Sequence, residues 1–552
     1  MVNYNIISST DQATVVAEYC PEYGAGPQYY QSEAELEKEF IDLLLTQGYK
    51  RLAINNEASF IANLRTQLEA LNDFIFSDKE WDRFFNESLA NENEGIVEKT
   101  RKIQEDHVQV LRLDNGMTKN IYLIDKKNIH NNRLQVINQY EEEGGKRKTR
   151  YDVTILVNGL PLVHIELKRR GIAIREAFNQ ISRYQRESFW GSKGLFEYVQ
   201  IFVISNGTYT KYYSNTTRDA HVKEQRESNR RKSKKTSNSF EFTSYWADAK
   251  NRIIPDLIDF TKTFFSKHSL LNILTKYCVF TSEELLLVMR PYQIVATEKI
   301  LSKIVIGTNY KKTGTKEAGG YIWHTTGSGK TLTSFKAAIL ATEIESIDKV
   351  IFVVDRKDLD YQTMKEYDRF ERGAANGNNS TRVLQRQLEN KNENGNYHDY
   401  KIIVTTIQKL DNFIRKNKSH DIYKKHIVLI FDECHRSQFG SMHQAIIKSF
   451  KNYHIFGFTG TPIFPENAPT GGSPLFRTTQ QVFGDQLHTY TIVDAINDGN
   501  VLPFRIDFVD SMKLPDYMKD EKVYAIDKEQ AFMEPKRISW KLALTLMREN
   551  LR

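Results

Sequence analysis

Arg150-Tyr-Asp-Val-Thr-Ile-Leu-Val-Asn-Gly-Leu-Pro-Leu-Val-His-Ile-Glu-Leu-Lys168 is the stretch that decides the fold of the first part of this 552-residue chain. Val153, Ile155 and Val157 occupy every second position before Asn158-Gly159, and a second apolar run follows that turn. This pattern predicts a β-hairpin. The hairpin carries Asp152 on its first strand and Glu166 and Lys168 on its second. Because side chains alternate between the two faces of a strand, Glu166 and Lys168 point to the same face.

Two carboxylates and a lysine in this arrangement suit metal-dependent hydrolysis of a phosphodiester. Pairing of the two strands brings Asp152 and Glu166 close enough to bind Mg²⁺ together, and the Ile165 carbonyl is a natural further ligand. Lys168 can position or help activate water and stabilise charge. The competing interpretation is a hairpin that carries ordinary surface charges.

Two predicted helices extend this candidate site. The helix predicted over 32–48 carries Glu37, our candidate for an additional acidic ligand, and Glu33, its rival; a solvated helix face is the alternative. The helix predicted over 172–187 carries Gln180 and Tyr184, which lie four residues apart and therefore on one face. A Q-x-x-x-Y pattern after the catalytic strand resembles the RecB-like branch of the PD-(D/E)xK nucleases, which adds both side chains to the catalytic group.

A second signature, His324-Thr-Thr-Gly-Ser-Gly-Lys-Thr331, follows an apolar run at 320–323. A strand, a glycine-rich loop and a helix N-terminus in this order form a cradle for phosphates, because backbone N–H groups and the helix dipole favour anions. Lys330 can reach the β- and γ-phosphates of ATP, and the Thr331 hydroxyl can ligate Mg²⁺. The general phosphate-loop pattern has glycine where His324 stands. The predicted ATP contacts of the loop are Thr326, Gly327, Ser328, Gly329, Lys330 and Thr331.

Asp432-Glu-Cys-His435 follows a third apolar run, at 427–431. Asp432, at the end of that predicted strand, can hold Mg²⁺, and Glu433 can polarise the attacking water. An exposed acidic turn is the alternative for an isolated Asp-Glu-x-His. The next predicted strand closes with Thr459-Gly-Thr-Pro462. From the corresponding elements of helicases we expect the following residues to couple the state of ATP to DNA contact: His435, Thr459, Gly460, Thr461 and Pro462.

Two shorter segments also resemble helicase motifs. Arg290-Pro-Tyr-Gln293 resembles the element that reads adenine, with Gln293 bonding the edge of the base and Tyr292 stacking on it. Thr405, Thr406 and Lys409 lie at the end of another predicted strand, where their hydroxyls and ammonium group suit contacts with DNA phosphates.

The bulk composition limits the class of protein. Charged residues make up 27% and hydrophobic residues 40%, and we find neither an apolar run long enough for a bilayer nor a signal-peptide pattern, so we expect a cytoplasmic protein. Three scattered cysteines indicate neither a zinc cluster nor a disulfide framework. A net charge of +7 is compatible with a polyanionic partner. The basic run 230–235, within the polar segment 215–239, is either a solvated loop or a contact with the DNA backbone.

The chain resembles the R (restriction and motor) subunit of type I restriction–modification systems, of the IC-like kind. The resemblance rests on the hairpin quoted above and on the runs 319–331, 352–359 and 431–439. It implies a multidomain α/β fold: a PD-(D/E)xK, RecB-like nuclease domain over 1–260, then a RecA-like superfamily 2 helicase lobe over 261–469. Residues 470–552 resemble the beginning of a second RecA-like lobe, which we expect to be incomplete within this sequence.

The same resemblance implies an ATP-dependent translocase of double-stranded DNA that carries a Mg²⁺-dependent endonuclease. The expected cofactors are ATP and Mg²⁺, and the expected partners are double-stranded DNA and the M (methyltransferase) and S (specificity) subunits, with no membrane involved. Two alternatives stay open at this point: a shortened chain that binds DNA or ATP without turnover, and a helicase without a working nuclease.

Overall fold

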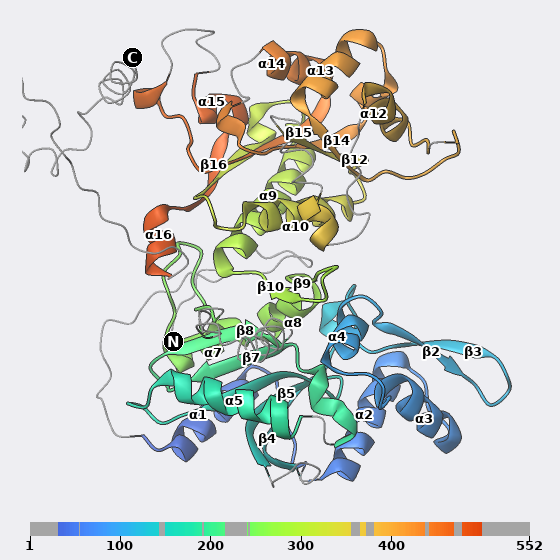
Figure 1. The fold of residues 1–552 in the computed structure, drawn as a ribbon, viewed down its shortest axis with the longest axis vertical. Helices are drawn as coiled ribbons and strands as arrows, with labels where there is room; N and C mark the ends of the chain where they lie inside the picture. The colour runs from blue at the N-terminus through green and yellow to red at the C-terminus, as the bar shows by residue number, and fades with distance from the viewer. Residues whose placement is uncertain are drawn as a thin grey trace, which may run out of the picture.

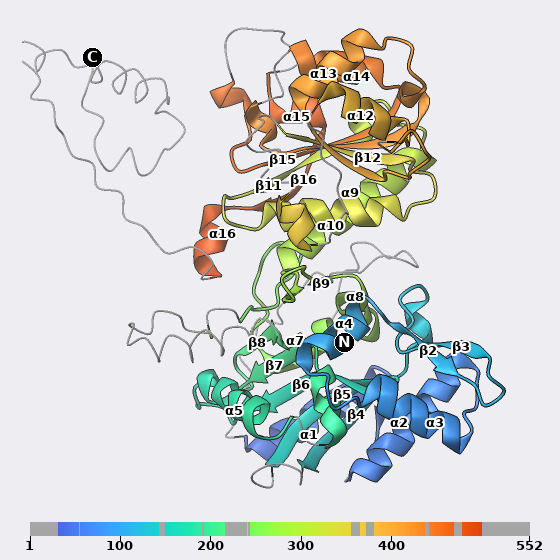
Figure 2. The ribbon, with the colours of Figure 1, turned by 45° about the vertical axis from the view of Figure 1, so that its right-hand side comes forward.

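The computed structural model describes residues 31–498 except 55, 143–148, 190–191, 216–239, 241–242, 355–364, 371–379, 393, 437–440 and 469–476. Two α/β domains follow one another along the chain and lie end to end (Figures 1 and 2). Each domain is built on a six-stranded sheet, and a two-stranded hairpin and a long helix join them. The polar segment 215–239 lies, apart from its first residue, outside the described residues.

The N-terminal domain is built on a mixed sheet with the strand order β1-β4-β5-β6-β7-β8. β4, β5 and β6 pair antiparallel, whereas β6 and β7 run parallel and are joined through α5. The strands are β1 Lys50–Arg51, β4 Leu134–Glu142, β5 Thr149–Val157, β6 Leu160–Leu167, β7 Ile201–Ser205 and β8 Thr210–Ser214. A separate ribbon of β2 Val108–Arg112 and β3 Thr118–Tyr122 extends from this domain (Figure 1). The helices are α1 Glu33–Thr46, α2 Glu57–Asn72, α3 Asp78–Phe84, α4 Ile96–Gln104, α5 Ile174–Glu187, α7 Leu257–Phe264 and α8 Lys267–Thr275, with short π or 3-10 turns at Phe85–Leu89, Ile129–Asn131 and Ser192–Tyr198.

The predicted hairpin is confirmed as β5 and β6. Val153 pairs with Ile165, and Asn158 and Gly159 close the turn with positive φ angles of 51° and 84°. A side chain at Gly159 would stand 2.7 Å from the Cα of Leu64 on α2, so both the backbone conformation and the close approach require glycine. The turn therefore fixes the register that sets Asp152 against the end of β6.

The second domain is a parallel sheet with the order β13-β12-β14-β15-β11-β16. The predicted strands at 320–323 and 427–431, and those that end near Thr405 and Thr459, are present, and successive side chains in this sheet enter two apolar clusters on opposite faces. Helices α9 and α10 cover one face, and α12, α13 and α14 cover the other (Figure 1). The strands are β11 Gly320–His324, β12 Lys349–Val354, β13 Ile402–Thr406, β14 His426–Phe431, β15 Asn452–Thr459 and β16 Asp485–Tyr490. The helices are α9 Pro291–Asn309, α10 Lys330–Thr342, α12 Thr381–Leu388, α13 Ile407–Lys416, α14 Ser441–Ser449, α15 Thr479–Phe483 and α16 Ile492–Asn497, with 3-10 turns at Lys316–Ala318, Asp421–Lys424, Cys434–Arg436 and Pro465–Asn467.

The packing differs from the predicted domain boundaries at 260 and 470. The N-terminal apolar core continues through α7, α8 and the hairpin of β9 Cys278–Phe280 and β10 Leu286–Val288, as far as Val295. At the other end, β16 pairs in parallel with β11, so residues 485–490 share a sheet with the phosphate loop. Among the described residues, the stretch 477–498 is therefore continuous with the second domain, and residues 499–552 lie outside the described part.

Candidate nuclease and ATP sites

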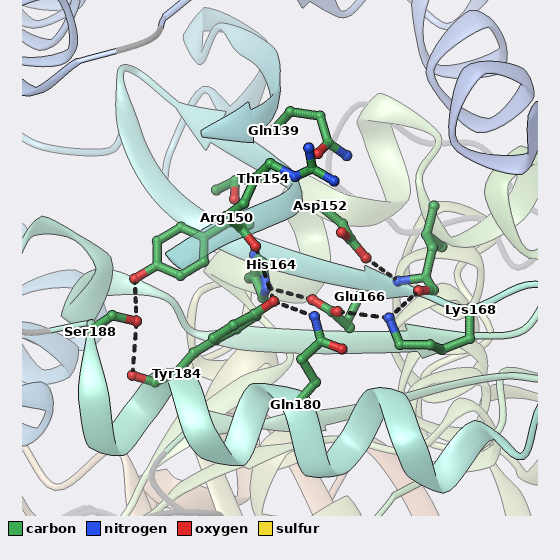
Figure 3. Close-up of polar contacts among 12 residues, drawn as sticks. Gln139, Arg150, Asp152, Thr154, His164, Glu166, Lys168, Gln180, Tyr184 and Ser188 are labelled. Atoms are coloured by element: carbon green, nitrogen blue, oxygen red, sulfur yellow. Dashed lines mark hydrogen bonds and ion pairs between the residues drawn. The ribbon is translucent and has the colours of Figure 1, made fainter. Parts of the chain in front are cut away.

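Asp152, Glu166 and Lys168 lie together where β5 and β6 pair (Figure 3). The Asp152 Oδ2 accepts a hydrogen bond from the backbone N–H of Leu167 at 2.9 Å. The Lys168 Nζ donates to the Glu166 Oε1 at 3.1 Å and to the Leu167 carbonyl at 2.8 Å. The three side chains that the sequence singled out therefore form one cluster, with Glu166 fully buried at its base.

Burial disfavours the charge of both carboxyls of this cluster. Burial, and then the proximity of Glu166, raise the pKa of Asp152 to about 7. Burial raises the pKa of Glu166 to about 7 against the opposing effect of Lys168. Burial also opposes the charge of Lys168, but Glu166, Asp152 and Glu33 outweigh it and raise the pKa of that lysine. The site thus contains one positive charge, the Lys168 ammonium group, and it favours additional positive charge.

Helix α1 presents both predicted acidic candidates to this region. The Glu33 Oε1 lies 3.3 Å from the Lys168 Nζ. Glu37, one turn further along, is buried, and its carboxylate accepts hydrogen bonds from the side-chain amides of Asn138, at 2.7 Å, and Gln139 on β4. Burial raises the pKa of Glu37, and Asp152 adds to that rise. Glu37 therefore faces Asp152, whereas Glu33 faces Lys168.

Gln180 and Tyr184 lie on one face of α5, as their spacing predicts. The Gln180 amide donates to the Tyr184 hydroxyl, which donates in turn to the Arg150 carbonyl on β5 at 3.0 Å. Burial raises the pKa of Tyr184, and the nearby Glu166 carboxyl adds to the effect. The pair therefore holds α5 against the strand that carries Asp152.

The residues of this cluster fit a divalent cation by the chemistry of their donors. Two carboxyls whose pKa burial raises are stabilised as carboxylates by added positive charge, and oxygen ligands are those that Mg²⁺ prefers. Within the described part of the chain, no group of three or more His, Cys, Asp or Glu side chains is arranged to hold a metal unaided. The predicted use of Asp152, Glu166, the Ile165 carbonyl and Glu37 as metal ligands stays a prediction.

His164 and Thr154 belong to the same cluster, and our reading of the sequence did not single them out. His164 is fully buried, two residues before Glu166 on β6, and its Nδ1 lies 3.1 Å from the Thr154 hydroxyl on β5. Burial lowers the pKa of His164 to about 4, so its imidazole is neutral. The signal that could have found it is the period of two, which puts His164, Glu166 and Lys168 on one face of the strand.

The raised pKa values predict how the metal-free fold responds to pH. The folded chain holds protons on Asp152 and Glu166 up to about pH 7, whereas unfolded carboxyls release them near pH 4. Their contribution to stability is therefore complete below about pH 4 and is lost as the pH rises through 7. We expect Asp152→Asn, with chelator present, to stabilise the domain at pH 8 by about 1–2 kcal/mol, which raises Tm by a few degrees.

Thermal unfolding of Asp152→Asn and of the unchanged chain at pH 5 and pH 8 measures this effect. The two Tm values are expected to converge at pH 5, where both carboxyls of the unchanged chain are protonated. A Tm at pH 8 that is lower for Asp152→Asn than for the unchanged chain would contradict the electrostatic account.

The phosphate loop connects β11 to α10, as predicted. Gly327 and Gly329 have positive φ angles of 81° and 74°, and a side chain at Gly329 would stand 2.7 Å from the Gln293 amide nitrogen. Lys330 begins α10, and its Nζ lies 3.7 Å from the Glu433 Oε1. Thr326 is exposed, Ser328 is buried, and Thr331 is half-buried in the first turn of α10. The helix N-terminus and the lysine therefore converge on the Asp-Glu motif.

The two motifs that follow the phosphate loop contact each other. The His435 Nδ1 lies 2.9 Å from the Thr459 hydroxyl, which also accepts the backbone N–H of Thr461. A side chain at Gly460 would stand 3.4 Å from the Thr326 hydroxyl and from the His324 carbonyl, so this segment lies against the phosphate loop. Pro462 follows directly along the chain. The structure thus joins the strand ends of β11, β14 and β15 into one polar site.

Asp432 occupies the position expected of a metal-binding carboxylate. It follows β14, and burial, then the neighbouring Glu433, raise its pKa to about 6, while the backbone N–H of Glu433 opposes the rise. Glu433 has a positive φ of 42° and lies between Lys330 and His435, whose Nδ1 is 3.5 Å from its Oε2. Strained backbone of this kind gathers at functional sites.

The adenine-reading prediction is only partly consistent with the geometry. Arg290 and Gln293 precede and enter α9, but the Gln293 amide donates to the Ser328 carbonyl at 3.2 Å. The ring of Tyr292 is buried, stacks on Tyr490 of β16 at 3.6 Å, and its hydroxyl donates to the Ser328 carbonyl at 2.8 Å. Tyr490 occupies one face of the Tyr292 ring, so stacking of adenine on Tyr292 stays a prediction that involves the other face. Both side chains also support the phosphate loop.

The predicted DNA contacts at the end of β13 also need correction. Thr405 and Thr406 are fully buried, so their hydroxyls do not reach a DNA phosphate. The Thr406 hydroxyl caps α13 by accepting the backbone N–H of Lys409. Only Lys409, which is half-buried, remains able to extend toward solvent.

Comparison with known proteins places both sites in families. A model of the type I restriction enzyme R protein N terminus matches residues 30–221, and a model of the SWI2/SNF2 ATPase matches residues 292–536. The EcoprrI endonuclease subunit of Escherichia coli, from a type I restriction enzyme, is 50% identical over 299 residues, which cover 54% of this chain and 90% of that protein. The chain belongs to the endonuclease subunits of type I restriction enzymes.

A longer relative of this type I endonuclease subunit shows how far the similarity extends. The endonuclease subunit of a type I restriction enzyme from Staphylococcus saprophyticus is 40% identical over 521 residues, which cover 92% of this chain and 51% of the relative. The chain thus spans about half the length of such curated relatives. The nuclease cluster and the phosphate loop both fall inside the matched families. None of the helices in the described part combines the length and hydropathy needed to cross a bilayer.

Proposed function

We propose that this subunit first translocates along double-stranded DNA, driven by ATP, and then cleaves unmodified DNA in a Mg²⁺-dependent reaction. The observation that carries the proposal is the cluster of Asp152, Glu166 and Lys168 in a domain joined to a phosphate loop that faces Asp432 and Glu433. Its chemistry requires two separate sites on one subunit, one for the phosphodiester and one for ATP.

At the nuclease site the carboxylates of Asp152 and Glu166 hold Mg²⁺, with the Ile165 carbonyl and Glu37 as further candidate ligands. Mg²⁺ supplies charge neutralisation for the scissile phosphate and lowers the pKa of water. Lys168, fixed by Glu166 and by the Leu167 carbonyl, orients the attacking water and stabilises negative charge. Gln180 and Tyr184 hold α5, and thereby the wall of the site, against β5.

At the motor site the backbone of Thr326 to Gly329 and the N-terminus of α10 bind the phosphates of ATP. Lys330 neutralises the β- and γ-phosphates, while Thr331 and Asp432 hold Mg²⁺. Glu433 polarises the attacking water. The contact between His435 and Thr459 then transmits the state of the γ-phosphate to the segment 459–462, and Lys409 is the remaining candidate contact with DNA.

The proposed partners are double-stranded DNA and the M and S subunits of the same system, of which S reads the recognition sequence. Because the chain spans about half the length of its long relatives, the test uses the complete restriction complex that contains this subunit.

Withdrawal of either cofactor is expected to stop cleavage for a different reason. A chelator removes Mg²⁺ from both sites, so cleavage and ATP hydrolysis both cease. A non-hydrolysable ATP analogue with Mg²⁺ present leaves the nuclease site loaded but stops translocation, so cleavage of unmodified circular DNA also falls to background. Gel assays of strand breaks, with fully methylated DNA as the uncut control, measure both. Cleavage that continues at its full rate with the analogue would contradict the coupling of the two sites.

A further inference from the structure

Beside Glu166 in the proposed nuclease site lies a buried histidine, His164, that the proposed chemistry does not use. The His164 Nε2 and the Glu166 Oε2 are 3.6 Å apart, and both side chains are fully buried. Neither atom has a hydrogen-bond partner in the described part of the chain. A buried polar atom without a partner is costly, so two that face each other call for an explanation.

The surroundings of His164 leave its ring little freedom. The rings of Tyr151, Tyr184, Phe189 and Phe202 enclose it, with centroids 5.6, 6.0, 5.7 and 6.3 Å from the imidazole. Its Nδ1 faces the Thr154 hydroxyl at 3.1 Å, with the Val153 backbone close by. An imidazole held on all sides by aromatic rings keeps its Nε2 directed along the strand toward Glu166 (Figure 3).

From this arrangement we infer that His164 is a positioning residue, which donates its Nε2–H to the Glu166 Oε2 and so fixes that carboxylate for metal binding. An ionised carboxylate only accepts hydrogen bonds, and a neutral imidazole carries one N–H, so the pairing requires the proton on Nε2. The Thr154 hydroxyl then donates a hydrogen bond to Nδ1, which favours the tautomer with the proton on Nε2. The 3.6 Å separation is slightly beyond a hydrogen bond, and contacts of this kind close when the site is loaded.

The pairing divides the two oxygens of Glu166 between two tasks. Oε2 is directed to His164, while Oε1, which already contacts the Lys168 Nζ, is directed to the metal and the water. Without His164 the carboxylate keeps its contact with Lys168, but the buried Oε2 loses a polar neighbour. Outer contacts that orient a metal ligand are worth about 10–100-fold in metal affinity.

Two substitutions at position 164 separate the hydrogen bond from the packing. In His164→Gln the amide nitrogen lies near the position of Nε2, so the donor to Glu166 is kept. In His164→Asn the amide lies near Nδ1, within reach of Thr154 only. Thr154→Val removes the hydroxyl with little change of shape, and Thr154→Ser restores it. Tyr151→Phe is the matched control, because it deletes a buried hydroxyl in the same cluster that bonds Ser188 at 2.8 Å.

The measurement is Mn²⁺ binding to the nucleotide-free protein, followed by the spin resonance signal of free Mn²⁺. The binding that Glu166→Gln removes defines the nuclease site. We expect His164→Asn to weaken that binding about 10–100-fold and Thr154→Val to weaken it in the same direction. His164→Gln, Thr154→Ser and Tyr151→Phe are expected to stay within about threefold of the unchanged chain.

The inference rests on the proposed nuclease function, and the two fail differently. If Glu166→Gln removes no Mn²⁺ site, the proposed function fails and this inference with it. If Glu166→Gln does remove a Mn²⁺ site, two results overturn only the inference. The first is an unchanged Mn²⁺ affinity of that site in His164→Asn, and the second is an equal loss of affinity in His164→Gln and His164→Asn. Should His164→Asn not fold, Thr154→Val decides: unchanged Mn²⁺ affinity in that variant overturns the role of His164.

Discussion

Glu166→Gln is expected to reduce cleavage of unmodified DNA by about 10³-fold or more in the restriction complex that contains this subunit. Glutamine keeps the shape of the side chain but removes the charge that Glu166 shares with Asp152 and Lys168. Since the two carboxyls are the proposed side-chain donors for Mg²⁺, a neutral side chain leaves one carboxylate, and the scissile phosphate is expected to lose both its metal and its oriented water.

Glu176→Gln is the matched control for that variant. Glu176 is exposed on α5, four residues before Gln180, and the same change there alters a surface charge of the same domain. Strand breaks in plasmid DNA are counted over time for both variants. Cleavage by Glu166→Gln within about threefold of the unchanged enzyme would remove Glu166 from the catalytic group.

Lys330→Ala is expected to reduce DNA-stimulated ATP hydrolysis by about 10²–10³-fold. The Lys330 Nζ lies between the N-terminus of α10 and Glu433, where the β- and γ-phosphates are proposed to bind. Loss of this ammonium leaves the developing charge on the γ-phosphate without its positive partner, and Glu433 without its neighbouring cation. Cleavage is expected to fall as well, because translocation precedes it.

Lys425→Ala provides the control for the motor. Lys425 directly precedes β14, at the opposite end of that strand from Asp432, and is largely exposed. Phosphate release in the presence and absence of unmodified DNA measures the effect of both variants. Hydrolysis by Lys330→Ala at half the unchanged rate or more would contradict the assignment of the phosphate loop.

Local patterns made the central residues of both sites predictable. The pairing of β5 with β6 across the Asn158-Gly159 turn determines which side chains meet, so Asp152, Glu166 and Lys168 could be placed together without a structure. The phosphate loop is likewise a contiguous segment whose glycines carry the required positive φ angles. In both cases the chemistry depends on residues close in the chain or paired across one turn.

The predictions that needed correction depend on distant contacts. Tyr292 was expected to stack on adenine, but one face of its ring is covered by Tyr490, which a strand at the far end of the domain brings to it. That same pairing of β16 with β11 moved the boundary predicted at 470. Thr406 was assigned to DNA from its hydroxyl, yet the start of α13 uses that hydroxyl as a cap. His164 was overlooked because an isolated buried histidine carries no motif.

The most direct test of the account records ATP hydrolysis and DNA strand breaks in one reaction, with the complex that carries Glu166→Gln. We expect DNA-stimulated ATP hydrolysis within about twofold of the unchanged enzyme and strand breaks at background. The reason is that the cluster at Glu166 is proposed to cut DNA, whereas the phosphate loop at Lys330 is proposed to drive the motor. Strand breaks at the unchanged rate would contradict the claim that these are two separate sites with these separate tasks.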